Sequence, residues 1–418
     1  MMTEPSSLQP GSILVFEPHT GGHHASYLAS LLAHGPDDRP SSWVVAPSFP
    51  ERHPELMSNA ARRGISVVPL TPEEGAALTR SGRGRLAPAR RALTEWGLLC
   101  RYATRLGASQ AVTLYFDPLL QLCLPLRFSA PVPISGIYFR PTLHYPGFPD
   151  GPALGARERL RAARQTLALR AALGHPRLGV IFSLDPLAVP ALQALGPQER
   201  VRPLPDPVEP LVSSAAEIEA LRSRLQIAPE RKIALMFGAL TARKGLSETL
   251  RALGALRRAE LSRLTLLVVG RVAPALYAEV ERARRSLGAR APGSVVVQDE
   301  FVPEGEVQRY FELADVVLAP YQEHVGSSGI QIRAAAAGRP LIGPSYGLMG
   351  ELTRRHRLGA RVDSTSPQAI LEALRAVLQG SSLGVSPAEQ RRFAESHTGA
   401  SFAEAFFRGL ESVAHRGS

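Results

Sequence analysis

Long apolar runs and cysteine are both scarce in this sequence of 418 residues. No stretch reaches the roughly 20 apolar residues that a membrane-spanning helix needs, so we expect no transmembrane segment. The start of the chain, MMTEPSSLQPG, lacks a basic segment followed by an apolar run, so we expect no secretory signal. Cys100 and Cys123 are widely spaced and form no metal-type pattern, which favours a reduced, cytoplasmic protein.

Lysine is almost absent as well. Lys232 and Lys244 are the only lysines, and arginine supplies the other basic residues. The net charge of +11 at pH 7 would ordinarily indicate an acidic partner, but richness in arginine and alanine also arises from a biased genome composition. No basic stretch is interleaved with aromatic residues and no nucleic-acid module is present, so we expect no nucleic-acid partner.

Short β-rich runs alternate with helical patterns along the chain. The runs are nearly uninterrupted Val, Leu and Ile, which is typical of strands buried on both faces of a parallel sheet. Strands are expected at Ile13–Phe16, Trp43–Ala46, Ile65–Leu70, Ala111–Phe116, Ile134–Phe139, Val180–Leu184, Ile233–Phe237, Leu264–Val269, Val295–Gln298, Val316–Ala319 and Leu341–Ile342. Helical patterns lie at Arg90–Leu106, Ala156–Leu173, Ala216–Leu225 and Ile330–Ala337. The sequence therefore predicts two doubly wound, Rossmann-like α/β domains.

A proline-dense connector, Val201–Pro210 (VRPLPDPVEP), separates the two halves, because such a segment is neither a helix interior nor a central strand. We predict an N-terminal domain of residues 1–208, a C-terminal domain of residues 209–395, and a closing segment of residues 396–418. The basic stretch Arg80–Arg91, which contains Gly and Pro, is predicted to be a solvated loop.

The segments that follow the strands are the candidate sites, because ligands of open α/β sheets bind beyond the carboxyl ends of the strands. After the first strand, Gly21 and Gly22 permit a tight turn into a helix with free backbone N–H groups, although a plain connecting turn is the alternative. In the second half Gly238 ends a strand, and Arg243 and Lys244 stand at the head of a helix. Two cations beside a helix N-terminus predict a phosphate site.

A second loop of the C-terminal half has the same character. The strand Val316–Ala319 leads through a polar segment into a small-residue helix that ends at Gly338. Small residues at the start of that helix leave its N–H groups open to a diphosphate, while a tight packing turn is the alternative. The residues in question are Gly326, Ser327, Ser328 and Gly329.

These segments resemble the GT-B glycosyltransferases, and in particular glycosyltransferase family 4. The resemblance rests on four pieces in the family's order: the run from Gly238 to Gly245, Leu266–Val272 (LLVVGRV), Phe301–Tyr321 and Ala334–Gly343 (AAAAGRPLIG). It implies a GT-B fold of two domains that face a central cleft. It also implies a hexosyltransferase-type enzyme, retaining and without a bound metal or other cofactor, whose co-substrate is a nucleotide sugar.

The resemblance assigns roles to individual residues. Lys244 pairs with the donor diphosphate, the loop from Gly326 to Gly329 cradles the same group, and Gly21 and Gly22 meet it from the other domain. The helix Ala400–Leu410 would cross back to the N-terminal domain.

The sequence departs from the family where Arg precedes the Lys-Gly pair, since Ala239 stands there, and Arg243 is the candidate substitute. The family has two glutamates eight residues apart around this glycine loop, and the sequence does not keep the pair. Counting back from AAAAGRP puts Val325 and Arg333 at the two positions, and counting forward from Glu323 puts Glu323 and Gln331 there. Glu323 is the candidate to place the sugar.

In the N-terminal half, Asp117 follows the strand Ala111–Phe116, and Arg140 and His144 follow another strand. The family often places a histidine that faces the sugar near here, and His144 is the candidate. Arg140 is a candidate for contact with an acidic acceptor or the donor phosphate, or for pairing with Asp117.

The predicted helix Ala156–Leu173 carries Arg157, Arg161 and Arg164 on one face beside an apolar stripe that includes Leu160 and Leu167. An ordinary surface helix with this stripe on the sheet is one interpretation. Contact with an anionic membrane or a polyanionic acceptor is the other.

The functional prediction is a cytoplasmic glycosyltransferase of polysaccharide or glycolipid biosynthesis, with possible peripheral contact to the inner face of a membrane. A catalytically impaired GT-B protein that binds a nucleotide sugar or a partner is the first alternative. A dinucleotide-dependent Rossmann enzyme is the second, although neither glycine turn carries the G-x-G-x-x-G pattern and no Walker-type loop is present.

Overall fold

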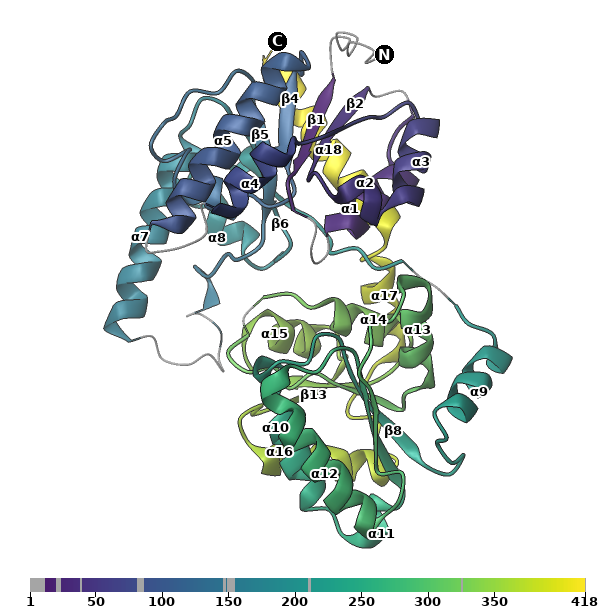
Figure 1. Ribbon diagram of the computed structural model, residues 1–418. Helices are drawn as coiled ribbons and strands as arrows, with labels where there is room; N and C mark the ends of the chain where they lie inside the picture. Colours follow the sequence, from purple (N-terminus) through teal and green to yellow (C-terminus); the bar gives the residue numbers. More distant parts are fainter. Residues whose placement is uncertain are drawn as a thin grey trace. The chain divides into compact units, whose positions relative to one another are not determined.

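The computed structural model describes residues 12–19, 24–37, 40–80, 86–145, 148, 155–209, 212–324 and 326–417 (Figure 1). The chain forms two compact units. The first takes the described residues before position 146, residues 155–207 and the closing helix from Gly399, and the second takes Val208–Thr398. The sequence analysis placed the two boundaries after residues 208 and 395, and the structure has them after residues 207 and 398.

A seven-stranded parallel sheet in the order β3-β2-β1-β4-β5-β6-β7 forms the centre of the first unit. Its strands are β1 (Ile13–Glu17), β2 (Ser41–Val45), β3 (Ser66–Pro69), β4 (Gln110–Thr113), β5 (Ile134–Tyr138), β6 (Leu178–Ser183) and β7 (Val201–Pro203). The helices are α1 (His24–His34), α2 (Phe49–Arg52), α3 (Pro54–Arg62), α4 (Pro72–Arg80), α5 (Ala87–Arg105), α6 (Asp117–Gln121), α7 (Ala156–Leu173), α8 (Val189–Gln193), the 3-10 turn η2 (Gln198–Arg200) and α18 (Gly399–Gly417).

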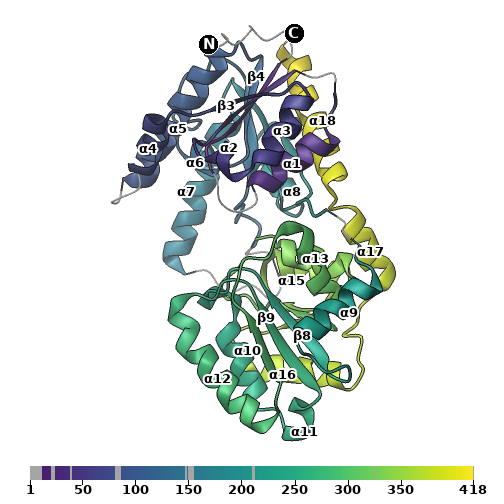
Figure 2. The ribbon, with the colours of Figure 1, turned by 45° about the vertical axis from the view of Figure 1, so that its right-hand side comes forward.

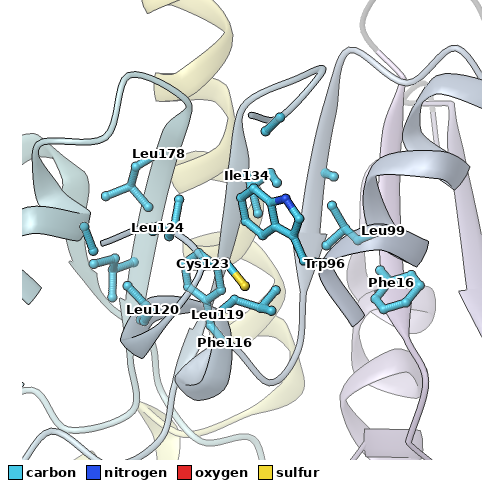
Figure 3. Packing of buried hydrophobic residues seen from close by; sticks show 14 of the residues in the cluster. Phe16, Trp96, Leu99, Phe116, Leu119, Leu120, Cys123, Leu124, Ile134 and Leu178 are labelled. Carbon is cyan, nitrogen blue, oxygen red and sulfur yellow. The ribbon is translucent and has the colours of Figure 1, made fainter. Parts of the chain in front are cut away.

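Helices cover both faces of this sheet, and its central strands β1, β4, β5 and β6 are buried along their whole length. Residues of α5 and α6 pack on one face, where Trp96 and Cys123 lie among leucines (Figure 3). On the other face α18 lies beside α1 (Figure 2), and its Phe402 and Phe406 pack into the core there. The closing helix is therefore part of the first unit's core.

The second unit is built around a six-stranded parallel sheet in the order β10-β9-β8-β11-β12-β13. Its strands are β8 (Lys232–Phe237), β9 (Leu264–Val269), β10 (Val295–Gln298), β11 (Val316–Leu318), β12 (Leu341–Pro344) and β13 (Gly359–Val362). Its helices are α9 (Ala215–Arg224), η3 (Ala242–Lys244), α10 (Leu246–Gly254), α11 (Arg258–Leu261), η4 (Pro274–Leu276), α12 (Tyr277–Arg290), α13 (Glu304–Leu313), α14 (Gly329–Ala336), α15 (Gly347–Arg355), α16 (Pro367–Leu378) and α17 (Pro387–Glu395). The prediction of two doubly wound α/β domains is confirmed.

Each sheet has one point at which the strand order reverses. In the first unit this switch point lies between β1 and β4, and in the second between β8 and β11. The loops that leave two neighbouring strands in opposite directions open a crevice there, at the carboxyl ends of the strands. The two switch points are therefore where each unit is best able to bind a ligand.

The proline-dense connector begins with β7, an edge strand, where a missing N–H is tolerated, so the connector contains neither a helix interior nor a central strand, as predicted. Other local predictions were wrong. The strand β13, also at an edge, was missed because only Val362 of its four residues is buried. The strand expected at Ala111–Phe116 ends at Thr113. The predicted loop Arg80–Arg91 lies in α5 from Ala87 on, and residues 81–85 are outside the described residues.

The helix α7 has the predicted bounds but not the predicted buried face. Leu160 and Leu167 are 55% and 65% exposed, and the contacts with the core are made instead by Leu169, Ala172 and Leu173 at its C-terminal end. The interpretation that placed the Leu160 stripe on the sheet was therefore wrong, since only the last turns of α7 reach the core.

A glycine at the start of β13 tests the register of the second sheet. Gly359 has φ of +149°, and a Cβ there would overlap the backbone of its strand partner Leu341. We expect Gly359→Ala to lower the free energy of unfolding by about 2–4 kcal/mol through backbone strain and steric overlap. The matched control is Gly254→Ala at the end of α10, which faces open space and should raise stability by about 0.5–1 kcal/mol. Equal urea-unfolding midpoints for the two variants would contradict the register.

Candidate functional site

The two loops at the switch point of the second unit meet on the side chain of Tyr321. The Nζ atom of Lys244, which follows β8, donates a hydrogen bond to the Tyr321 hydroxyl at 2.6 Å and lies 3.9 Å from the centre of its ring. The hydroxyl of Ser328, which follows β11, donates to the same oxygen at 3.4 Å. The lysine and the serine turn, which are 84 positions apart in sequence by subtraction of their numbers, thus share one partner.

A second set of contacts joins the same loops. Arg243 donates from its guanidinium to Nδ1 of His324 at 2.9 Å, and Nε2 of His324 donates to the carbonyl of Ser327 at 3.0 Å. The backbone N–H of Gln322 donates to the Arg243 carbonyl at 2.7 Å. These contacts order the basic side chains before any ligand arrives, which lowers the entropy cost of binding.

Gly245 explains how the loops come so close. Its φ is +72°, and a Cβ on it would overlap the carbonyl of Pro320, the residue before Tyr321. A side chain at this position would force the loops apart. The Lys-Gly pair is therefore a structural unit, in which the glycine sets the approach and the lysine supplies the charge.

The helix α14 begins at this point. Ser328 is its N-cap, and the Ser328 side chain forms no capping hydrogen bond with the helix. The residues from Gly326 to Gly329 are partly exposed, so the first N–H groups of the helix are accessible to a ligand. Together with Lys244 and Arg243 they provide positive charge and oriented dipoles for an anion such as a diphosphate.

Neither register of the family's glutamate pair brings a buried carboxylate to this loop. Glu323 is exposed and has φ of +50°, a conformation unusual for a residue other than glycine. Gln331 is buried, and its amide donates to the Met349 carbonyl at 2.9 Å and to the Thr353 hydroxyl at 2.8 Å. Arg333 forms an ion pair with Glu304 on α13. Gly238 lies at the end of β8 with φ of +106°.

In the first unit, Asp117 and Arg140 lie near each other. Burial raises the pKa of Asp117 to about 6. Two neighbours act in the opposite direction and lower this pKa: the Phe139 N–H, which donates to Oδ2 at 2.9 Å, and the charge on Arg140. The other carboxylate oxygen has no hydrogen-bond partner among the described residues. The guanidinium of Arg140 is exposed and available to an anion.

His144 has an acidic partner that the sequence did not reveal. Its Nε2 lies 2.8 Å from Oδ2 of Asp185, which follows β6, and both side chains are largely buried. The other carboxylate oxygen of Asp185 accepts the N–H groups of Leu187 and Ala188 at 2.9 and 3.2 Å. The carboxylate is therefore held in place and orients the imidazole.

Acidic and imidazole groups also gather at the switch point of the first unit. The buried carboxylate of Glu17 lies 2.9 Å from Nδ1 of His19 and 2.7 Å from Nδ1 of His24. Burial alone would raise the pKa of Glu17, but hydrogen bonds and charge from the two histidines hold it below its ordinary value. Gly21 and Gly22, the predicted ligands between these histidines, lie outside the described residues.

The sequence identified the basic and small residues but missed their polar partners. Tyr321, His324 and Asp185 all stand within a few positions of a strand's carboxyl end, which was the signal used for the other candidates. Tyr321 was overlooked because an aromatic residue after a buried strand is ordinarily a core residue, and Tyr321 is indeed almost fully buried apart from its role in the site.

Residues 231–380 of the chain match the family Glycosyl transferases group 1. No curated protein matches the sequence. The fold is similar to that of HepE from Anabaena, solved in complex with UDP, at a TM-score of 0.66 and 14% identity over 96% of this chain and 100% of that one. Sucrose-phosphate synthase from Thermosynechococcus elongatus has a TM-score of 0.66 at 15% identity, covering 98% of this chain and 100% of that chain.

A third similar structure is WaaG, a glycosyltransferase involved in lipopolysaccharide biosynthesis, with a TM-score of 0.58 and 16% identity over 97% of this chain and 98% of that one. These identities are low, so the likeness establishes the fold alone, and the family match covers residues 231–380 of the second unit. The chain is a glycosyltransferase of the GT-B fold, and within its second unit residues 231–380 match the family Glycosyl transferases group 1.

Proposed function

We propose that the chain transfers a sugar from a nucleoside diphosphate sugar held by its second unit to a hydroxyl of an acceptor glycan or glycolipid. The observation that carries this proposal is the convergence of Lys244 and Ser328 on the Tyr321 hydroxyl, at the switch point between β8 and β11. The structures of HepE with UDP and with UDP-glucose support a uridine diphosphate sugar as the donor class.

The charge distribution of the site fits the leaving group. When the bond between the sugar carbon and the phosphate oxygen breaks, negative charge builds up on the diphosphate. Lys244, Arg243 and the first N–H groups of α14 oppose that charge in a preformed arrangement. Because these groups supply the stabilisation, we propose that the diphosphate needs no divalent ion.

His144 and Asp185 are assigned to the acceptor side. An imidazole held by a fixed carboxylate is able to accept a hydrogen bond or a proton from a sugar hydroxyl. Arg140 and Asp117 are assigned to an acidic group of the acceptor or the donor phosphate. We retain the prediction that the anomeric configuration is kept, which the resemblance to family 4 implies and which NMR of the product's anomeric proton measures.

A protein that binds the donor without turnover is the second candidate. The residues at the family's glutamate positions favour it. Gln331 is hydrogen-bonded to α15 and Arg333 forms an ion pair with Glu304, so neither register supplies a buried carboxylate. Release of free UDP from UDP-glucose in the presence of mixed acceptors supports transfer. Binding of UDP-glucose without any release supports the second candidate.

Contact with a membrane surface is proposed for α7. Among the described residues no helix has the length and apolarity to cross a bilayer. The N-terminal part of α7 nevertheless exposes Leu160 and Leu167 together with Arg157, Arg161 and Arg164. Such a helix binds an anionic lipid surface through both its apolar area and its charge.

The role of Lys244 is tested with the only other lysine as the control. Lys244→Ala should weaken UDP binding roughly 10- to 100-fold, since a charge-assisted hydrogen bond contributes about 1.5–3 kcal/mol. Lys232 lies at the opposite end of β8, beside Asp315 at 3.7 Å, so Lys232→Ala should leave UDP binding unchanged. Thermal shift against UDP concentration measures both. Unchanged stabilisation of Lys244→Ala by UDP would place the phosphate site elsewhere.

The His144–Asp185 pair is tested by separating binding from turnover. We expect His144→Asn to retain the affinity for UDP but to lower the rate of transfer roughly 100-fold, the usual effect of removing a proton-transfer group. Asp185→Asn should lower the rate and shift its pH profile, because the imidazole loses the carboxylate that orients it. A wild-type rate for His144→Asn would remove this pair from the acceptor site.

The membrane proposal is tested by co-sedimentation with liposomes that contain anionic phospholipid. Binding should be strong at low salt and weak at high salt, because salt screens the attraction between the exposed arginines and the anionic lipids. Replacing Leu160 and Leu167 together by Ser should reduce binding at low salt, while both leucines are too exposed for this change to unfold the helix. Absence of wild-type binding at low salt would rule out the surface.

A further inference from the structure

Three side chains at the end of β1 present metal-binding atoms to one another. Glu17 is the last residue of the strand, His19 follows it, and His24 is the first residue of α1. One carboxylate oxygen of Glu17 and one ring nitrogen from each histidine lie within 4.8 Å of one another. Glu17 is fully buried, and both histidines keep about a sixth of their side-chain surface exposed, so solvent reaches both rings.

The surroundings of His19 match those of a metal-binding histidine. Its Nδ1 faces Glu17, while its Nε2 lies 3.5 Å from Oε1 of Glu95, a carboxylate that is itself buried. Arg91 donates to the same Glu95 oxygen at 2.8 Å and holds it in place. Metal-bound histidines usually have a carboxylate at their second ring nitrogen, which fixes the ring and strengthens the ligand, and Glu95 stands on that side of His19.

We propose that Glu17, His19 and His24 bind one divalent transition-metal ion of the zinc class. Two imidazole nitrogens and one carboxylate oxygen form a ligand set that zinc favours and that the oxygen-seeking ions Mg²⁺ and Ca²⁺ do not. The ring planes of the two histidines are nearly parallel, with centres 5.1 Å apart, so their Nδ1 atoms approach the carboxylate from neighbouring directions.

The geometry requires only a small adjustment. With zinc–ligand bonds of about 2.1 Å, tetrahedral ligands lie roughly 3.4 Å apart. Nδ1 of His19 lies 2.9 Å from Oε1 of Glu17, and Nδ1 of His24 lies 2.7 Å from Oε2. With one carboxylate oxygen as the ligand, the three ligand atoms lie within 4.8 Å of one another and would have to shift by about an ångström around an ion. The fourth coordination position would face the exposed side of the group and take water or an anion.

A bound ion would join the end of β1 to the first turn of α1. Because the three ligands come from two elements that the folded chain brings together, the ion would bind the native state in preference to the unfolded chain and stabilise it. The three ligands belong to the first unit, and none of them is assigned to the diphosphate, although Gly21 and Gly22 lie between His19 and His24 in the sequence. Zinc binding is measured without a nucleotide sugar, so its failure is distinguishable from a failure of the proposed transferase activity.

The experiment is a zinc titration of the metal-free full chain in competition with a coloured chelator, together with thermal melts. We expect one equivalent of zinc to bind and to raise the melting temperature, and we expect no effect of Mg²⁺ or Ca²⁺. Cobalt substitution should give the visible absorption of a tetrahedral site.

The variants separate this site from adventitious binding. His24→Ala should weaken zinc binding at least 30-fold, while His34→Ala, an exposed histidine at the other end of α1, should bind zinc like the wild type. Far-UV circular dichroism confirms that both variants are folded, and His19→Ala repeats the test should His24→Ala unfold. Substoichiometric zinc binding by the wild type, or equal affinity in His24→Ala and wild type, would overturn the proposal.

Discussion

The parallel pairing of β11 with β8 is the constraint on which the candidate donor site depends. Val316 pairs with Ala234 and Val317 with Leu235, so the two strands end side by side although the chain runs through β9 and β10 between them. The loops that follow the two strands therefore begin next to each other at the carboxyl edge of the sheet. The Lys244–Tyr321 contact is the result, and the absence of a side chain at Gly245 sets how close that contact is.

The same constraint acts in the first unit, where β1 and β4 are neighbours, but the buried carboxylates there experience opposite environments. Glu17 is buried between two imidazoles, which lower its pKa despite the burial. Asp117 is buried with one oxygen lacking a partner, so burial raises its pKa to about 6. A buried carboxylate keeps its charge only where a positive or proton-donating group faces it, and the difference between these two residues follows from that rule.

The sequence predicted what depends on local pattern and missed what depends on distant partners. Strands such as Leu264–Val269 were predicted to the residue because continuous apolar runs leave one interpretation. Lys244 and Ser328 were predicted because they follow strand ends, yet the residue that joins them, Tyr321, looked like an ordinary core aromatic. The pairing of His144 with Asp185 spans 41 positions, by subtraction, and no local pattern encodes it.

The structure shows what one of the residues at the family's glutamate positions does instead. Gln331 occupies a position where the resemblance would have a carboxylate facing the donor ribose, but its amide instead fastens α14 to the Met349 carbonyl and the Thr353 hydroxyl of α15. A carboxylate there could not donate either hydrogen bond and would be buried without compensation. The residue thus helps to hold the N-terminus of α14 against the lysine loop. If Lys244 and the first N–H groups of α14 bind the diphosphate, as we propose, recognition of the ribose has to come from residues other than Gln331.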